Sequence, residues 1–142
     1  MNKHYKIGYT TGVFDLFHIG HLNLLRRAKE RCEFLIVGVS VDQLVEYKGK
    51  KPVIPFEERI DIVRAIKYVD LAVPQNNMNK FEAWENYKFD VMFVGDDWKN
   101  TNKWNNYEEQ FSKIGVDIIY FPYTKSTSST LIKDTLINLM PE

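Results

Sequence analysis

Short runs of β-branched and aromatic residues alternate along this chain with longer stretches that have the period of a helix. The runs lie near 6–11, 34–39, 70–73, 90–95 and 116–121, and the helical stretches near 20–32, 56–67, 78–87, 104–113 and 128–139. This alternation is typical of a parallel sheet with helices on both faces. Pro52 and Pro55 mark 41–55 as a loop rather than a helix. The pattern therefore predicts an α/β fold, a doubly wound five-stranded parallel sheet.

Length and charge narrow the class of protein. The 142 residues fit one compact domain over 1–142. Nineteen basic residues balance nineteen acidic ones, so nothing in the net charge favours a nucleic-acid partner. Cys32 is the only cysteine, which excludes an intramolecular disulfide. Because residues 1–6 do not resemble a signal peptide and every apolar run is short, we expect a cytoplasmic protein without membrane insertion.

Ligands of doubly wound sheets bind beyond the carboxyl ends of the strands, where the strand order reverses. Four segments follow predicted strands and are expected to meet in one crevice there: 11–21, 40–51, 95–98 and 122–130. The unusual residues of the sequence lie in these four segments. We therefore expect the functional site at this edge of the sheet.

The first of these segments opens a helix and carries two histidines. His18 and His21 are three residues apart, so both imidazoles would lie on one helix face. A helix N-terminus favours phosphate, and imidazoles there can donate hydrogen bonds to oxygens that gain charge during transfer. A zinc site is disfavoured, because His4 is the only further imidazole. Ordinary capping or core histidines are the other alternative.

The pattern from Gly12 to His21 resembles the signature of the cytidylyltransferases, which carry a histidine–any–glycine–histidine motif in a Rossmann-like nucleotidyltransferase fold. The resemblance continues through Tyr68-Val69-Asp70 and Gly95-Asp96-Asp97-Trp98 to the serine-rich segment near 126–130. Gly95 to Trp98 and the short chain look like the bacterial glycerol-3-phosphate branch. Phe14 to His18 looks closer to the choline- and ethanolamine-phosphate branch. The histidine motif alone is shared with adenylyltransferases.

Residue types and resemblance together assign roles. The predicted catalytic residues are His18, His21, Lys48 and Lys67. The predicted nucleotide-binding residues are Thr11, Gly12, Val13, Phe14, Gly20, Gly95, Asp96, Thr124, Ser128, Ser129 and Thr130. The predicted substrate-binding residues are Asp15, Lys50 and Trp98. Two departures from the family pattern stand out: Tyr123 and Lys67 occupy positions where the family carries arginine, and lysine lacks the bidentate fork.

The resemblance implies transfer of CMP from CTP to a small phosphorylated alcohol, with release of pyrophosphate. Mg²⁺ is expected to bind with CTP, and the protein is expected to hold no metal of its own. The resemblance also implies a homodimer. Glycerol 3-phosphate leads the candidate acceptors, and other polyol or amino-alcohol phosphates remain open. The alternatives are an adenylyltransferase acting on a small phosphate such as FMN, and a nucleotide-binding module without catalysis.

Overall fold

The computed structural model describes residues 4–47, 49, 51–122, 124 and 126–140. Five strands form the sheet: β1 (Tyr5–Gly12), β2 (Cys32–Ser40), β3 (Leu71–Gln75), β4 (Val91–Gly95) and β5 (Asp117–Phe121). The helices are α1 (Ile19–Glu30), α2 (Asp42–Tyr47), α3 (Phe56–Ala65), α4 (Lys80–Tyr87), α5 (Asn102–Ser112) and α6 (Ser129–Leu139), with a 3₁₀ turn η1 (Asp96–Trp98) after β4.

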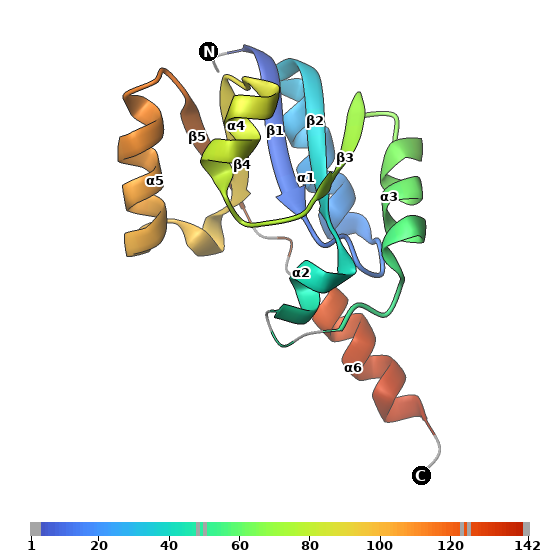
Figure 1. Cartoon of the computed structure of the whole chain (residues 1–142). Coiled ribbons are helices and arrows are strands. Elements are labelled where there is room, and N and C mark those ends of the chain that lie inside the picture. The colour runs from blue at the N-terminus through green and yellow to red at the C-terminus, as the bar shows by residue number, and fades with distance from the viewer. Residues whose placement is uncertain (1–3, 48, 50, 123, 125, 141–142) are drawn as a thin grey trace.

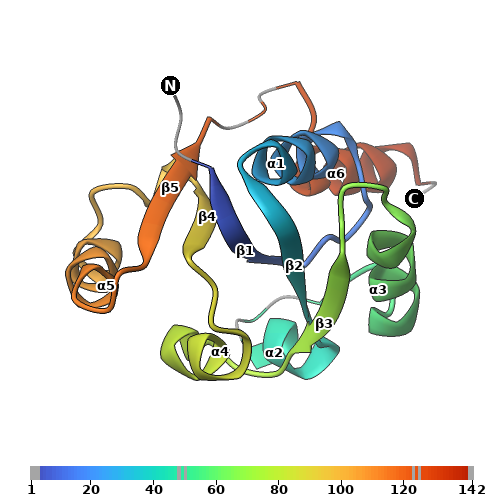
Figure 2. The same ribbon diagram turned by 90° about the horizontal axis from the view of Figure 1, so that it is seen from above.

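The strands pair in the order β3-β2-β1-β4-β5, and every pairing is parallel. The predicted doubly wound α/β fold is thus confirmed. Helices α1 and α3 cover one face of the sheet, and α4 and α5 cover the other (Figures 1 and 2). The strand order reverses at β1, between β2 and β4. Because β1 occupies this switch point, the turn that follows it opens into the crevice where ligands of such folds bind.

Alternating residues of the strands feed two apolar cores. In β2, Leu35, Val37 and Val39 belong to the core beneath α1 and α3, which also contains Leu25 and Ile60. Ile36, which points the other way, joins the core beneath α4 and α5. The two cores hold β1 and β2 from both faces, and this burial explains why the central strands read as apolar runs.

The prediction of an uninterrupted loop over 41–55 was wrong, because α2 forms within it. Leu44 and Val45 are buried there, and this burial stabilises a single short helix ahead of the two prolines. Pro52 and Pro55 restrict only the residues beside them. In the described part of the chain, no helix has both the length and the apolar character that crossing a membrane requires.

Candidate active site at the turn after the first strand

Three cavities adjoin at the carboxyl ends of the strands, and Leu24 borders all of them. The cavity that we name the α6 cavity, of about 270 Å³, lies between α1, Gly95 and the segment 121–130. The loop cavity, of about 260 Å³, lies between residues 11–15 and the end of the loop at Pro52. The β4 cavity, of about 280 Å³, lies between β1, β4 and the start of α4. Described residues of all four predicted segments therefore contribute to one composite crevice.

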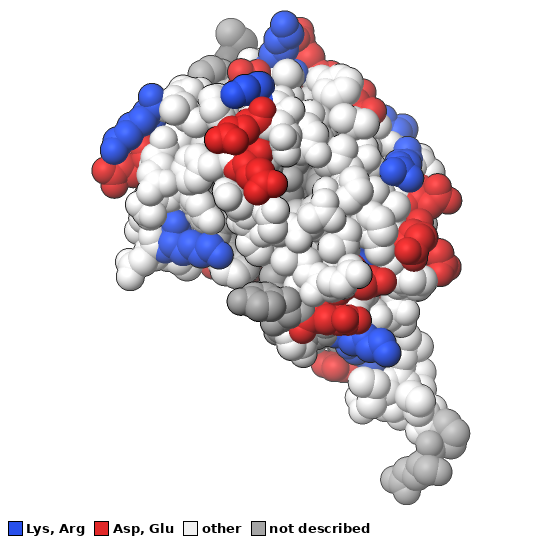
Figure 3. Space-filling view, viewed as in Figure 1, with Lys and Arg blue, Asp and Glu red and all other residues white. Residues whose placement is uncertain are grey.

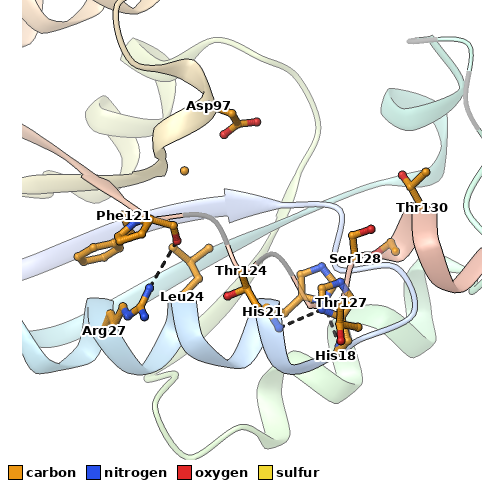
Figure 4. A pocket seen from close by; sticks show the side chains of 14 residues that line it. His18, His21, Leu24, Arg27, Asp97, Phe121, Thr124, Thr127, Ser128 and Thr130 are labelled. Carbon is orange, nitrogen blue, oxygen red and sulfur yellow. Dashed lines mark hydrogen bonds between the residues drawn. The ribbon is translucent and has the colours of Figure 1, made fainter.

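The rings of His18 and His21 stack at the start of α1, and each side chain accepts a backbone N–H of that turn. The backbone N–H of Gly20 donates to Nδ1 of His18 (3.0 Å), and the backbone N–H of His18 donates to Nδ1 of His21 (3.2 Å). The ring centroids are 3.9 Å apart. Both rings line the α6 cavity, and His21 also lines the loop cavity (Figure 4). The two histidines thus cap the helix and face the crevice at once.

Both imidazoles are neutral at physiological pH. Burial lowers the pKa of His18, and burial lowers the pKa of His21 to about 3, helped by the neighbouring His18 and opposed by Asp15. Since each Nδ1 accepts a backbone hydrogen bond, the proton of each neutral ring is on Nε2. The pair therefore offers two Nε2–H donors, which can bind oxygens of a phosphate chain without adding fixed charge.

A strained turn holds these rings in place. Phe14 and Leu16 have positive φ angles of 55° and 51°, which is uncommon outside glycine. The buried ring of Phe14 lies against His21, with centroids 5.3 Å apart, and the ring of Phe17 lies at 5.2 Å. A Cβ at Gly20 would stand 2.8 Å from Cε1 of His18, so only glycine lets that ring fold back over the helix start. Such strain concentrates at functional sites.

Asp15 binds the C-terminal end of the loop that precedes α3. Its carboxylate accepts the backbone N–H groups of Val53 (2.7 Å) and Ile54 (2.9 Å). Its backbone carbonyl accepts the hydroxyl of Ser129, at the start of α6 (2.6 Å). Asp15 was predicted to bind substrate. It borders the loop cavity, and the two amides that its carboxylate accepts give it a positioning role as well; its role in substrate binding stays a prediction.

Arg59 is a buried residue that the sequence reasoning missed. Its guanidinium donates to the carbonyls of Val13 (2.7 Å) and Ser40 (2.8 Å), and its Nε donates to that of Ile54 (2.8 Å). It also pairs with Asp42 at 2.6 Å. One side chain thereby joins the ends of β1 and β2 to the loop. The sequence feature that could have revealed this burial is an arginine at an apolar position of α3, three residues after Phe56.

Lys80 is the second residue that was missed. It is only 5% exposed, and its ammonium donates to Oγ1 of Thr11 (3.1 Å). Both residues line the β4 cavity. A lysine in the first turn of a helix opposes the helix dipole. This unfavourable placement is the sequence feature that could have pointed to Lys80. A buried ammonium at the edge of a cavity is well suited to bind an anionic ligand.

The remaining predicted residues divide between the cavities. Gly20, Thr124, Ser128, Ser129 and Thr130 line the α6 cavity together with Gly95. Thr11, Gly12, Val13 and Phe14 line the loop cavity, and the first three also line the β4 cavity. The side chain of Phe14 is buried in the core, so its part is to support His21.

The residues after β4 divide between two of the cavities. Asp97, rather than the predicted Asp96, is the carboxylate on the wall of the α6 cavity (Figure 4). Trp98 borders the β4 cavity instead, where it is half exposed. A Cβ at Gly95 would lie 2.8 Å from Oδ1 of Asp97, which shows how closely this carboxylate approaches the strand end.

Of the three predicted lysines, only Lys67 belongs to the described residues, and it lies away from the histidines. Lys67 is exposed, lies between α3 and β3 at the opposite edge of the sheet, and holds its ammonium 5.3 Å from the ring centre of Tyr68. The predicted position of Lys67 beside the histidines is therefore wrong within a single chain. Lys48 and Lys50 lie outside the described residues, and their roles stay predictions.

A model of the cytidylyltransferase-like family matches residues 9–135, which include the histidine turn, the strand-end residues and the start of α6. The chain belongs to the cytidylyltransferase-like family. It is accordingly a nucleotidyltransferase, and the crevice described above coincides with the matched region.

Relatives of two activities share this family. A glycerol-3-phosphate cytidylyltransferase of Staphylococcus aureus is 37% identical over 89% of this chain and 92% of its own. The enzyme of the same name from Bacillus subtilis is 35% identical over 92% of this chain and 96% of its own. An FAD synthase of Pyrococcus abyssi is 35% identical over 86% of each chain. The exact substrate therefore does not follow from kinship alone.

A solved structure shares the fold at lower identity. The lipopolysaccharide core biosynthesis protein of Thermoplasma volcanium superposes with a TM-score of 0.71 at 24% identity, covering 87% of this chain and 99% of that one. This likeness supports the Rossmann-like architecture of the cytidylyltransferase-like chain.

Proposed function

We propose that this chain transfers CMP from CTP to a small phosphorylated alcohol, with glycerol 3-phosphate the leading acceptor, and releases pyrophosphate. The observation that carries the proposal is the position of the paired Nε2–H donors. They lie where the α6 cavity meets the loop cavity, and the β4 cavity with its buried ammonium adjoins both. Two ligands can thus approach one pair of neutral donors from different sides.

The α6 cavity is the proposed nucleotide site. It is lined by the hydroxyl-bearing residues of the segment before α6, by Arg27 and by the carboxylate of Asp97. A carboxylate can accept the amino group of cytosine, and hydroxyls at a helix start can bind phosphate or sugar oxygens. The phosphate chain would then extend past His18 and His21 into the loop cavity, above which the predicted Lys48 and Lys50 would close.

The β4 cavity is the proposed acceptor site. Lys80 and Thr11 would bind the acceptor's phosphate, and Trp98, Met78 and Gln75 would surround the rest of the molecule. Of the described residues that line this cavity, none is an aspartate or glutamate. A neutral alcohol therefore fits the cavity better than a cationic amino alcohol, whose charge would be placed near Lys80 and Lys103 without a counter-ion.

The reaction needs positioning more than proton transfer. A phosphate monoester is already an anion near neutral pH, so one of its oxygens can attack the α-phosphorus without a general base. The new P–O bond forms as the bond to the bridging oxygen breaks, and pyrophosphate leaves with that electron pair. The Nε2–H groups of His18 and His21 would donate to oxygens that gain charge in this step.

Mg²⁺ is proposed to arrive with CTP. The described residues hold no group of three or more His, Cys, Asp or Glu side chains that could bind a metal by themselves. Asp97 is the carboxylate on the α6 cavity wall, which fits an ion that takes most ligands from phosphate oxygens and water. Such an ion would neutralise charge on the leaving pyrophosphate.

The test is pyrophosphate release from CTP, ATP, GTP and UTP, each with a panel of acceptors. The panel holds glycerol 3-phosphate, ribitol 5-phosphate, phosphoethanolamine, phosphocholine and FMN. We expect CTP with a polyol phosphate to give the highest kcat/KM and Lys80→Met to raise the KM of the acceptor, not that of CTP. Equal raising of both KM values would contradict the division into two sites.

The adenylyltransferase alternative is supported by the FAD synthase relatives. Turnover of ATP with FMN in the same panel would establish it. Calorimetric binding of CTP without turnover on any acceptor would instead establish a binding module.

A further inference from the structure

A buried glutamine lines the β4 cavity at the end of β3. Gln75 is only 7% exposed, and its register partner in β2, Ser40, is 2% exposed. Alternate residues of a strand point to the same face, so Ser40 lies on the face of Ile36, beneath α4 and α5. Because burial of a polar group is costly unless the group is hydrogen-bonded, the partners of Gln75 decide what this side chain can do.

The amide of Gln75 is held by its oxygen, whereas its nitrogen has only a weak partner. Oε1 accepts the hydroxyl of Ser40 at 2.9 Å. Among the described residues, the partner of Nε2 is Sδ of Met78, at 4.0 Å. A thioether is a weak acceptor and the amide nitrogen carries two N–H groups, so at least one N–H has no oxygen acceptor in the described part of the chain. Buried polar groups nearly always have a partner, so this donor requires an oxygen atom from a ligand or from water.

The contacts of the amide place it at the β4 cavity. Ser40 and Met78, the two residues that the amide contacts, both line that cavity. Gln75 also borders a smaller cavity of about 110 Å³ next to Tyr9, but neither Ser40 nor Met78 lines that one. The amide group therefore belongs to the β4 cavity, which the buried Lys80 also lines.

We propose that Nε2 of Gln75 donates to a hydroxyl oxygen of the acceptor, a role that rests on the proposed function and defines its substrate class. The chain would then select phosphorylated polyols over phosphate monoesters that have no hydroxyl group. Lys80 supplies a cation for the phosphate, and a neutral amide suits a neutral hydroxyl. An acceptor without a hydroxyl would leave the buried donor unpaired, and sites built to bind a hydroxyl reject such analogues for this reason.

The surroundings of the amide also favour a polyol. The thioether of Met78 and the ring of Trp98 line the same cavity and can contact the methylene groups of such a chain. Residues 75–79 carry no charged side chain, and Figure 3 shows the surface over this connection between β3 and α4 as mostly white. Apolar groups beside one fixed amide match the alternation of methylene and hydroxyl groups in a polyol.

The test compares acceptors that differ only in their hydroxyl groups: glycerol 3-phosphate, 1,2-propanediol 1-phosphate, 1,3-propanediol phosphate and propyl phosphate. With CTP, we expect the wild-type kcat/KM to fall by about 10-fold or more from glycerol 3-phosphate to propyl phosphate. Gln75→Met keeps the length of the side chain and removes the donor, so it should reduce this ratio to about 3-fold or less. The matched control is Gln110→Met on the exposed side of α5, which should keep the wild-type ratio.

A binding measurement separates hydroxyl recognition from the proposed reaction. Calorimetry of glycerol 3-phosphate and propyl phosphate, with α,β-methylene CTP present, gives the same ratio without turnover. The double variant Ser40→Ala with Gln75→Met removes the hydroxyl that Gln75→Met alone leaves unpaired, and circular dichroism checks that both variants are folded.

A wild-type chain that binds both ligands equally, or a ratio that both variants keep, overturns the role of Gln75. Equal weakening of both ligands also overturns it, because the amide would then bind the phosphate. If the preference depends on Gln75 but no acceptor receives a nucleotide, the proposed function fails and the hydroxyl recognition stands.

Discussion

The α6 cavity is lined by two segments that are held in different ways. The turn after β1 is fixed from within the domain, by the buried Phe14, by Arg59 and by the reciprocal bonds of the two histidines. The described part of the segment before α6 is held near the helix start by Ser128 and Ser129, and by the bond between Thr124 and Asn23. Beyond that first turn, α6 is exposed.

This difference separates two tasks of the site. The donors proposed to stabilise the transition state are positioned by the core of one chain. Folding of that chain alone therefore sets their geometry. The hydroxyls proposed to bind the nucleotide are placed by a helix that is exposed beyond its first turn in one chain. Substitutions of the two histidines should therefore change turnover, whereas substitutions in α6 should change nucleotide affinity.

The largest expected effect is that of His21→Ala. Loss of a donor to transition-state charge should lower kcat by about 10² to 10³. Loss of its share of the capping box should cost only about 1 kcal/mol in the free energy of unfolding. Steady-state kinetics and urea unfolding measure the two quantities. His4→Ala, an exposed imidazole outside the crevice, is the control. Near-normal turnover of His21→Ala would refute the proposed role.

Asp15→Ala tests the connection between the two segments. The carboxylate accepts two backbone N–H groups, and a hydrogen bond to a charged group contributes about 1.5–3 kcal/mol. Releasing the loop should raise the KM of CTP by about 10-fold, since 1.4 kcal/mol corresponds to that factor in binding. Asp15→Asn, which keeps one carbonyl acceptor, should recover part of the loss.

A second readout separates positioning from general destabilisation. Limited proteolysis between residues 44 and 56 should become faster in Asp15→Ala, while cleavage elsewhere stays at the wild-type rate. Asp134→Ala on the exposed polar side of α6 is the control. A uniform increase in cleavage would show that Asp15 only stabilises the whole fold.

Much of this fold could be predicted because its signals are local. Each predicted strand and helix agrees with the observed bounds to within two residues, since hydrophobic period and turn residues mark them. Helix α2 was missed because Pro52 and Pro55 dominated the interpretation of its segment, although the buried Leu44 and Val45 stabilise it. A local sequence pattern does not show which short pairs of apolar residues will be buried in a core.

The site was harder to predict because its decisive facts are long-range. The histidine spacing placed both rings together, but the sequence does not show which nitrogen accepts a backbone bond. Arg59 and Lys80 look like surface residues until burial shows their partners. Likewise, a helical pattern over 128–139 does not show that the apolar side chains of this helix are exposed. Burial and direction are properties of the assembled fold.

The neutral histidine pair predicts how stability depends on pH. Burial lowers the pKa of His21 to about 3 in the folded chain, against about 6.5 in the unfolded chain. The unfolded state therefore binds more protons between these values. The stabilising contribution is complete above pH 6.5 and is lost as pH falls toward 3, with a slope of up to about 1.4 kcal/mol per pH unit. Urea unfolding at pH 7, 6, 5 and 4 measures it, and His21→Asn should show a shallower slope.

The smallest expected effect is that of Ser128→Ala at the start of α6. Loss of this cap should cost about 1 kcal/mol of helix stability. Because α6 buries none of its residues in one chain, that cost should appear as local opening rather than in global unfolding. Hydrogen exchange should become faster in the amides of α6 and stay unchanged in those of α1. The KM of CTP should rise by less than in Asp15→Ala, with kcat kept.

Ser126→Ala, an exposed serine of the same segment, is the matched control and should alter neither exchange nor KM. The kcat of Ser128→Ala is then the strictest test of the difference between the two segments. If Ser128→Ala lowered kcat as strongly as His21→Ala, the helix start would hold the transition state as well as the nucleotide. In that case the hydroxyls would join the imidazoles in catalysis, and the two segments would share one task despite their different anchoring.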